Sequence, residues 1–178
     1  MERLRDFMKV TTTLSQAAYE EQFPHPLLLL APAGSALASL RHTQLVEVEQ
    51  AREAIDRFNA ELLEFVPLWP NPKHGPEFPR KVFIGRDARR DFVINHATVS
   101  GRHAALARDA DGDAWTLLDA GSTNGTMLRG RTLRPGQAVP VRDGDVITFG
   151  QVDALFFTPA GAYRFLRQYR LFSEAMRG

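Results

Sequence analysis

From about residue 60 onward the chain is a succession of short apolar or β-branched runs separated by turn residues. This pattern is typical of an all-β sandwich or barrel, in which short strands are joined by tight turns. Asp111-Gly112 and Asp143-Gly144 are turn signals, because glycine accepts the strongly bent backbone that tight turns need. The runs that we expect to be strands are 62–69, 81–85, 92–94, 104–108, 114–118, 127–128, 138–141, 146–149 and 154–157. The sequence therefore predicts a mainly β fold.

The segment before this region has a different pattern. Apolar residues recur at spacings of three and four over 2–22, which predicts an amphipathic helix. Prolines end it, and residues 27–31 form a short apolar run whose length favours a buried strand. A loop or weak helix is expected over 33–43, a second helix over 45–58 and a loop over the proline-rich stretch 70–76. Residues 1–57 are thus predicted to be an N-terminal accessory segment.

The pattern returns to helix after Thr158-Pro159, a capping hydroxyl followed by a first-turn proline. Residues spaced as on one helical face are apolar, and they include Ala162, Phe165 and Tyr169. The sequence divides into an accessory segment (1–57), a β domain (58–158) and a C-terminal helix (159–178).

Composition limits the classes of function. The 22 basic and 21 acidic residues give a net charge of only +1, so general attraction to nucleic acid or an anionic membrane is not expected. The chain has no cysteine, which removes thiolate catalysis and the common zinc frameworks, and we expect no metal and no cofactor. The N-terminus lacks the order of a signal peptide, and the most apolar stretch, 26–40, is shorter than the roughly 20 residues of a membrane span. A cytoplasmic protein is expected.

Three short segments at loop-like positions carry the chemistry. They are Gly85-Arg86, residues 100–103 (Ser-Gly-Arg-His) and residues 122–126 (Ser-Thr-Asn-Gly-Thr). The guanidinium of arginine is a planar fork of donors that matches phosphate, and the hydroxyls and the amide add neutral donors. None of these groups is an activated nucleophile. The three segments therefore predict a site that holds a small oxyanion without reacting with it.

These segments, together with Gly144-Asp145 and Phe149-Gly150, stand in an order and at spacings that are recognisable. Residues 82–150 resemble a forkhead-associated (FHA) domain, the family that reads phosphothreonine peptides. The resemblance implies a β-sandwich of two sheets and about eleven strands, with the peptide held by loops at one end. It also implies a non-enzymatic adaptor whose partner is a phosphothreonine protein or peptide, namely a Ser/Thr kinase or a kinase substrate.

The resemblance assigns roles residue by residue. Arg86 pairs with the phosphate, and Ser100 and Thr123 donate to its oxygens. Asn124 holds the peptide backbone beside the phosphothreonine, and Gly101 and Arg102 complete the expected binding set. Independently of the family, a phosphate carries roughly −1.5 to −2 charges at neutral pH and suits such a convergence of donors.

Other motif residues are expected to be scaffold. His103 is expected to tie the loops together, Ser122 to stabilise its own turn, and Gly85, Gly125 and Gly150 to supply backbone geometry. Trp115 and Phe149 alternate with polar residues and are core candidates.

One position departs from the family pattern. The residue after the key serine is often basic or amide-bearing in the family, whereas here it is Gly101, which offers only a backbone N–H. Arg102, Arg89 and Arg90 are the candidates to restore a positive contact.

Competing interpretations are weaker. A hydrolase would have to use Ser100, His103 and Asp119 without a nucleophile elbow, and a calcium loop at 109–113 lacks the required glycine and glutamate positions. We therefore expect no enzymatic activity. The main alternative is a structural or interaction protein that uses the FHA-like scaffold without phosphate, with the N-terminal segment as interface.

Three consecutive threonines, Thr11, Thr12 and Thr13, raise a further hypothesis. A phosphate on one of them would allow the protein to occupy its own pocket or that of another copy. The alternative is that they are simply part of a helix.

Overall fold

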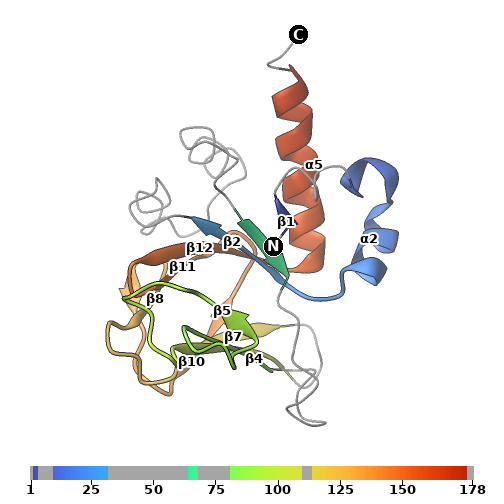
Figure 1. Ribbon diagram of the computed structural model, residues 1–178. Coiled ribbons are helices and arrows are strands. Elements are labelled where there is room, and N and C mark those ends of the chain that lie inside the picture. The colour runs from blue at the N-terminus through green and yellow to red at the C-terminus, as the bar shows by residue number, and fades with distance from the viewer. Residues whose placement is uncertain (1, 4–9, 32–63, 68–80, 110–113, 176–178) are drawn as a thin grey trace.

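The computed structural model describes residues 2–3, 10–31, 64–67, 81–109 and 114–175 (Figure 1). Within these ranges the chain forms two β-sheets that share one hydrophobic core, and a long helix stands on the outer side of the larger sheet. The predicted fold class, a mainly β two-sheet sandwich with helical N-terminal parts and a C-terminal helix, is confirmed. No helix among the described residues is long and apolar enough to cross a bilayer.

Within the described part of the chain the larger sheet has seven strands, and its hydrogen-bonded neighbours are all antiparallel. In spatial order they are β1 (Glu2–Arg3), β3 (Glu64–Pro67), β2 (Leu27–Ala31), β12 (Val152–Phe157), β11 (Val146–Phe149), β8 (Thr126–Leu128) and β9 (Arg131–Thr132).

The smaller sheet has five strands among the residues that the structure describes. In spatial order they are β10 (Ala138–Val141), β7 (Trp115–Asp119), β6 (Ala104–Arg108), β4 (Lys81–Gly85) and β5 (Phe92–Val93). Neighbours are antiparallel except β4 and β5, which run parallel.

Alternation along the strands explains the core between the sheets. In β7, Trp115, Leu117 and Asp119 are buried, whereas the residues between them are half-buried on the outer face. Phe149 of β11 is fully buried in the same core. The prediction that Trp115 and Phe149 are core residues is confirmed.

The strand β2 is buried on both faces. Leu28 and Leu30 point into the sandwich core, while Leu27, Leu29 and Ala31 belong to a second cluster under the helices. A strand with two buried faces needs a continuous apolar run, and this accounts for the sequence Leu-Leu-Leu-Leu-Ala. The strand expected at 27–31 is confirmed, and it lies in the middle of the larger sheet between β3 and β12.

The helix α5 (Pro159–Ala175) packs on β12 and on the helix α2 (Gln16–Gln22). Thr158 caps α5, since its Oγ1 accepts a hydrogen bond from the backbone N–H of Gly161 at 3.1 Å. The buried face of α5 includes Ala162, Phe165 and Tyr169, as the helical periodicity predicts.

The expectation of one helix over 2–22 is wrong. Residues Glu2–Arg3 pair with β3, and the helix α2 starts only at Gln16, after Ser15, whose side chain accepts from the N–H of Ala18 and caps the helix. A serine that caps a helix interrupts the preceding periodic segment, because the N-cap residue has a non-helical backbone. The short strand β9 was not expected. The predictions for 33–43, 45–58, 70–76 and Asp111-Gly112 lie outside the described residues.

Candidate functional site

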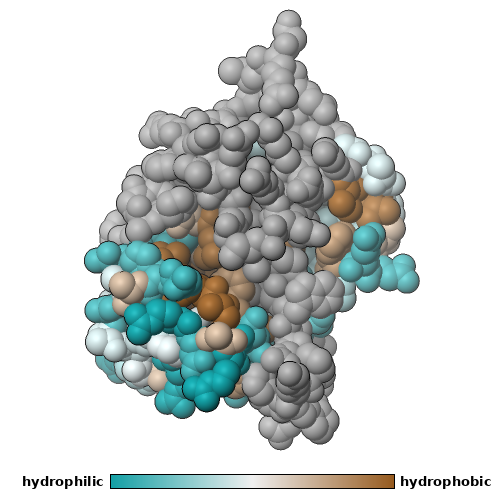
Figure 2. All heavy atoms as spheres, viewed as in Figure 1, coloured by the Kyte–Doolittle hydropathy of each residue, from teal (hydrophilic) through white to brown (hydrophobic). Residues whose placement is uncertain are grey.

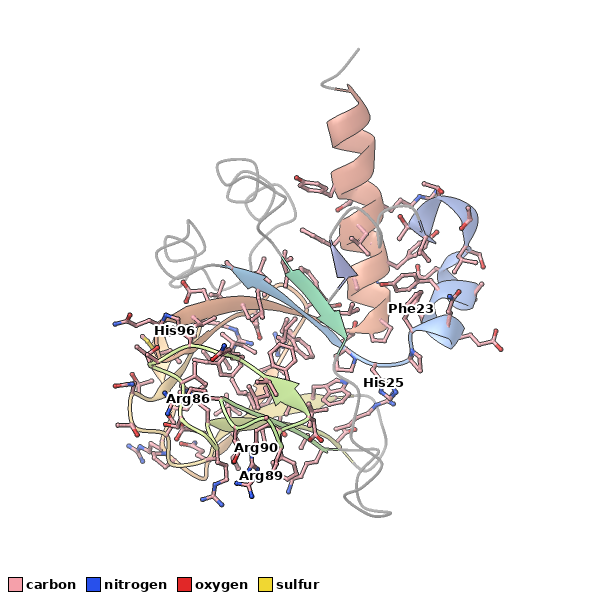
Figure 3. The ribbon with its side chains drawn as sticks, in the orientation of Figure 1. Phe23, His25, Arg86, Arg89, Arg90 and His96 are labelled. Carbon is pink, nitrogen blue, oxygen red and sulfur yellow. The ribbon has the colours of Figure 1, made fainter. Side chains whose placement is uncertain are left out.

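Three loops meet at one end of the sandwich. They are residues 86–91 after β4, 94–103 before β6, and 120–125 between β7 and β8; we call them the site loops. Strand register brings them together, because Ile84, Ala104 and Asp119 are paired neighbours across β4, β6 and β7. Figure 3 shows Arg86 and His96 at this end, away from Phe23 and His25, and Figure 2 shows hydrophilic side chains gathered over it.

Gly85 permits the closest contact between two of the loops. The backbone N–H groups of Arg86 and Asp87 donate to the carbonyls of Ser100 and Gly101, at 2.9 and 3.3 Å. A Cβ on Gly85 would lie 2.3 Å from the carbonyl oxygen of Gly101, which no side chain can tolerate. The glycine is therefore required for the approach of the two backbones.

Arg86 is exposed at the end of the sandwich. Its Nη1 donates to the carbonyl of Ala97 over 3.4 Å, a long hydrogen bond. Among the described residues no carboxylate pairs with this guanidinium, in contrast to Arg89 and Arg90, which both lie beside Asp87. The guanidinium of Arg86 thus keeps most of its donors for a ligand.

Ser100 joins the second and third site loops. Its Oγ accepts from the backbone N–H of Thr123 at 3.0 Å and donates to Thr123 Oγ1 at 3.3 Å. The Nδ2 group of Asn124 donates to the carbonyl of Thr98 at 2.8 Å. Arg86, Ser100, Thr123 and Asn124, far apart in the sequence, therefore lie on loops that touch one another.

His103 is fully buried beneath these residues, with its ring edge-on to Phe149. Its Nδ1 accepts from the backbone N–H of Ser100 at 3.0 Å, and its Nε2 lies 3.1 Å from the carbonyl oxygen of Gly125. Because a carbonyl can only accept, Nε2 carries the proton and the ring is neutral. Burial lowers the pKa of His103 below its ordinary value of 6.5, against the opposing effects of the Gly125 carbonyl and Asp119.

Asp119 is the residue that the sequence reasoning missed as an anchor. It is 1% exposed, and its carboxylate accepts four hydrogen bonds, from the N–H groups of Gly121 and Ser122 and from the hydroxyls of Ser122 and Thr126. Burial alone would raise the pKa of this carboxyl, but the hydrogen bonds outweigh burial and hold it below the ordinary 3.8. An aspartate followed by Gly-Ser at the second and third positions is a side-chain turn signal that could have revealed it.

Ser100, His103 and Asp119 do not form a catalytic triad. The imidazole bonds the backbone of Ser100 and not its hydroxyl, and the oxygens of Asp119 are taken up by Gly121, Ser122 and Thr126. No group of three His, Asp or Glu side chains within the described ranges is placed to hold a metal ion.

Gly101 has room for a side chain. The nearest heavy atom to a Cβ at this position would be the Cβ of Asp87, at 3.8 Å, an ordinary contact. The absence of a side chain at 101 is therefore not imposed by packing, in contrast to Gly85.

The neighbouring arginines point elsewhere. Arg89 donates from Nε and Nη2 to Asp87 at 3.1 and 2.7 Å, and these bonds hold the pKa of the Asp87 carboxyl well below its usual range. Arg90 also lies beside Asp87, at 3.9 Å. Arg102 is exposed and reaches the carbonyl of Ala120 at 3.5 Å. Arg102 alone of the three thus remains without a carboxylate partner among the described residues.

Comparison with known proteins identifies the family of this region. Residues 82–150 match the family model of the FHA domain. A stretch of 73 residues is 34% identical to the FHA domain-containing protein At4g14490 of Arabidopsis thaliana, covering 40% of this chain and 18% of that protein. A stretch of 89 residues is 35% identical to the ABC transporter ATP-binding/permease protein Rv1747 of Mycobacterium tuberculosis, covering 50% of this chain and 10% of that protein. The chain thus spans less than a fifth of these curated relatives.

Solved structures also resemble the chain. The N-terminal FHA domain of Saccharomyces cerevisiae Rad53p, in complex with a phosphothreonine peptide, is 22% identical with a TM-score of 0.44. The match covers 53% of this chain and 84% of that domain.

Proposed function

Since residues 82–150 belong to the FHA domain family, we propose that this protein is a phosphothreonine-binding adaptor. Its partner is a protein phosphorylated by a Ser/Thr kinase, or the kinase itself, and the setting is the cytoplasm, where ATP-dependent kinases act. The site binds the modified threonine and carries out no reaction on it.

One observation carries the proposal. Two side-chain donors proposed for the phosphate, Arg86 and Ser100, donate only over long hydrogen bonds within the protein, 3.4 Å from Arg86 to the Ala97 carbonyl and 3.3 Å from the Ser100 hydroxyl to Thr123 Oγ1. A phosphate oxygen would replace these bonds with charge-assisted ones, of about 2.7–2.9 Å from the guanidinium and about 2.5–2.7 Å from the hydroxyl. The buried groups below them, by contrast, are fully engaged. The buried groups therefore hold the loops in place, while Arg86 and Ser100 at the surface have donors that an anion could accept from.

The proposed geometry follows from these donors. Arg86 faces the phosphate with its guanidinium, and Ser100 and Thr123 donate their hydroxyls to phosphate oxygens. Asn124 stands beside them with its Nδ2 on the Thr98 carbonyl, so its Oδ1 is the atom that accepts an N–H of the peptide backbone. Gly101 contributes a backbone N–H, and Arg102 adds positive charge at the rim.

The test uses two degenerate peptide pools that differ only in the phosphate on a central threonine. We expect the phosphorylated pool to bind and the unphosphorylated pool not to bind in a fluorescence anisotropy titration. Arg86→Ala removes at least one charge-assisted hydrogen bond, worth about 1.5–3 kcal/mol, so affinity should fall on the order of 10- to 100-fold.

Arg142→Ala is the matched control. Arg142 is also exposed, but it follows Val141, which pairs with Trp115 at the end of the sheet away from the site loops. The control should bind as the wild-type protein does. Equal binding of the two pools, or binding that survives Arg86→Ala, would contradict the proposed function and favour a phosphate-independent interaction protein.

A further inference from the structure

A groove of about 560 Å³ runs over the outer face of the smaller sheet. Strand register places Phe83, Ala105, Leu118 and Ala138 side by side across β4, β6, β7 and β10. These four residues form an apolar row close to the site loops, and all four line the groove.

A second row lies two residues further from the site loops. It consists of Lys81, Ala107 and Thr116, which are paired neighbours and also line the groove. The central strand β6 contributes only the methyl groups of Ala105 and Ala107, while Phe83 and Leu118 flank it. Small side chains in the middle and larger ones at the sides make this face concave.

The two sheets differ in what covers them. On the larger sheet, the outward side chains of β2 and β12 are buried in a cluster with α2 and α5. On the outer face of the smaller sheet, no element of the described chain packs over the groove.

The groove begins at the proposed phosphate site. Arg102, Ala120 and Gly121 line its upper end, and they belong to the same two loops that carry Ser100 and Thr123. Phe83 and Lys81 of β4 line the groove, and Lys81 lies about 13 Å, or about four extended residues, from the end of β4 at Gly85. A peptide that is long enough to continue beyond the site loops would therefore enter the groove without a break.

Charge indicates what the groove accepts. Arg102 stands at one end and Lys81 at the other, with apolar side chains between them. Among the described residues that line the groove, the one carboxylate is that of Asp119, which is 1% exposed and accepts hydrogen bonds from its own loop. The complementary ligand is an apolar segment with an acidic residue at each end.

We propose that this groove binds the segment of the phosphorylated partner adjacent to its phosphothreonine, and that it selects a short apolar stretch bounded by acidic residues. The inference rests on the proposed function. The groove on the smaller sheet would determine which phosphothreonine sites the protein recognises.

The experiment compares a short phosphothreonine peptide, selected from the degenerate pool, with two longer versions. The longer peptides carry an added Glu-Val-Leu-Val-Glu tail on one side or the other of the same core. We expect one of the tailed peptides to bind the wild-type protein at least about tenfold more tightly than the short one, because it buries apolar side chains.

Two variants test whether the gain in affinity from the tail arises in the groove. Ala107→Glu fills the groove with a carboxylate, and Lys81→Glu reverses an exposed charge at its end without touching the core. Each should abolish the gain from the tail and leave the affinity for the short peptide unchanged. Arg142→Glu, with the same charge change as Lys81→Glu at an exposed position outside the groove lining, should keep the gain.

Equal binding of short and tailed peptides, or a gain that survives both groove variants, would overturn the inference. Self-association that Ala107→Glu abolishes in sedimentation velocity would also overturn it, since a second copy would then be the occupant. If the short peptide binds regardless of its phosphate, the proposed function fails instead, because that peptide does not reach the groove.

Discussion

At the scale of single residues, the groups that hold the site loops differ from the groups that face the ligand. Asp119 and His103 are buried, and each of their polar atoms has a partner within the protein. Arg86 is exposed and makes only a long hydrogen bond. Buried polar groups are costly when unsatisfied, whereas an exposed donor can exchange water for a ligand oxygen. Burial and the presence of partners within the protein therefore distinguish residues that hold the loops from residues that bind the ligand better than residue type does.

Gly101 offers a test of whether an added exposed donor strengthens ligand binding. Gly101→Asn should strengthen phosphothreonine peptide binding by roughly three- to tenfold, because the amide adds a donor beside Ser100 and a hydrogen bond to a charged group is worth about 1.5–3 kcal/mol before its ordering cost. The space is open, since a Cβ would have its nearest neighbour at 3.8 Å. Isothermal titration calorimetry measures the effect, and Gly101→Ala is the control that adds the Cβ without the donor. Unchanged or weaker binding of the asparagine variant would show that the amide does not reach the phosphate.

His103 makes stability depend on pH. Its pKa in the folded protein is lowered by burial, while the unfolded value is 6.5, so below pH 6.5 the unfolded chain binds the proton more readily. The free energy of unfolding should therefore be highest above pH 6.5 and decrease as the pH falls towards the folded pKa, by at most about 1.4 kcal/mol per pH unit for one histidine.

The measurement is urea denaturation between pH 5 and pH 7.5. The pKa of His25 is also lowered, by burial and then by Arg108, so its contribution has the same sign. His25→Gln should retain the part of the dependence that comes from His103, and His103→Gln should remove it. A slope that is the same in wild type and His103→Gln would contradict the assignment.

At the scale of elements, α5 is tied to the sandwich at its N-terminus. Thr158 caps the helix, and its N–H and hydroxyl both donate to Asp143 in the turn between β10 and β11, at 2.6 and 3.2 Å. Arg164, one turn into the helix, reaches the same carboxylate at 3.0 Å. A Cβ on Gly161 would collide with this carboxylate. One aspartate thus fixes where the helix starts on the sheet.

Thr158→Ala should destabilise the protein by about 0.5–2 kcal/mol, the usual cost of losing an N-cap hydroxyl. Chemical denaturation measures the change, and the mutation should leave the affinity for phosphothreonine peptide unaltered because α5 lies away from the site loops. Gln168→Ala, at an exposed position of the same helix, should cause no loss. Equal stability of Thr158→Ala and wild type would mean that the cap contributes nothing.

At the scale of the whole molecule, the N-terminal segment is part of the β-sheet. β2 lies between β3 and β12, with Leu29 paired to Phe65 on one side and to Leu155 on the other. Its outward residues join those of β12, α2 and α5 in a second core that includes Tyr19, Leu27 and Phe165. The central strands β2 and β12 are therefore buried on both faces.

A fragment of residues 81–158 should consequently fail to fold as a monomer. Removing β2 exposes the edge of β12, and removing α2 and α5 exposes apolar side chains such as Leu155 and Phe157, both of which promote association. Size-exclusion chromatography and thermal unfolding followed by circular dichroism test this against the full chain. A monomeric fragment with a cooperative transition would show that the sandwich does not depend on these elements.

The sequence by itself determined the features that arise from neighbouring residues. Alternation located most strands of the sandwich, the period of 3.6 located α5, and three short motifs supplied the donors of the candidate site. These features follow from turn chemistry and side-chain periodicity, which act over a few residues and can be read from one stretch of chain.

Only the tertiary structure decided which distant segments meet. The central place of β2 depends on pairings such as Leu29 with Leu155, and the groove on the smaller sheet depends on the pairing of Phe83 with Ala105 and of Ala105 with Leu118. Whether two such strands pair is set by the free energy of the assembled core, and no local pattern encodes it. Ser15 is a further example. It caps α2, and α2 is a separate short helix that packs against α5, a contact that the periodicity of residues 2–22 does not indicate.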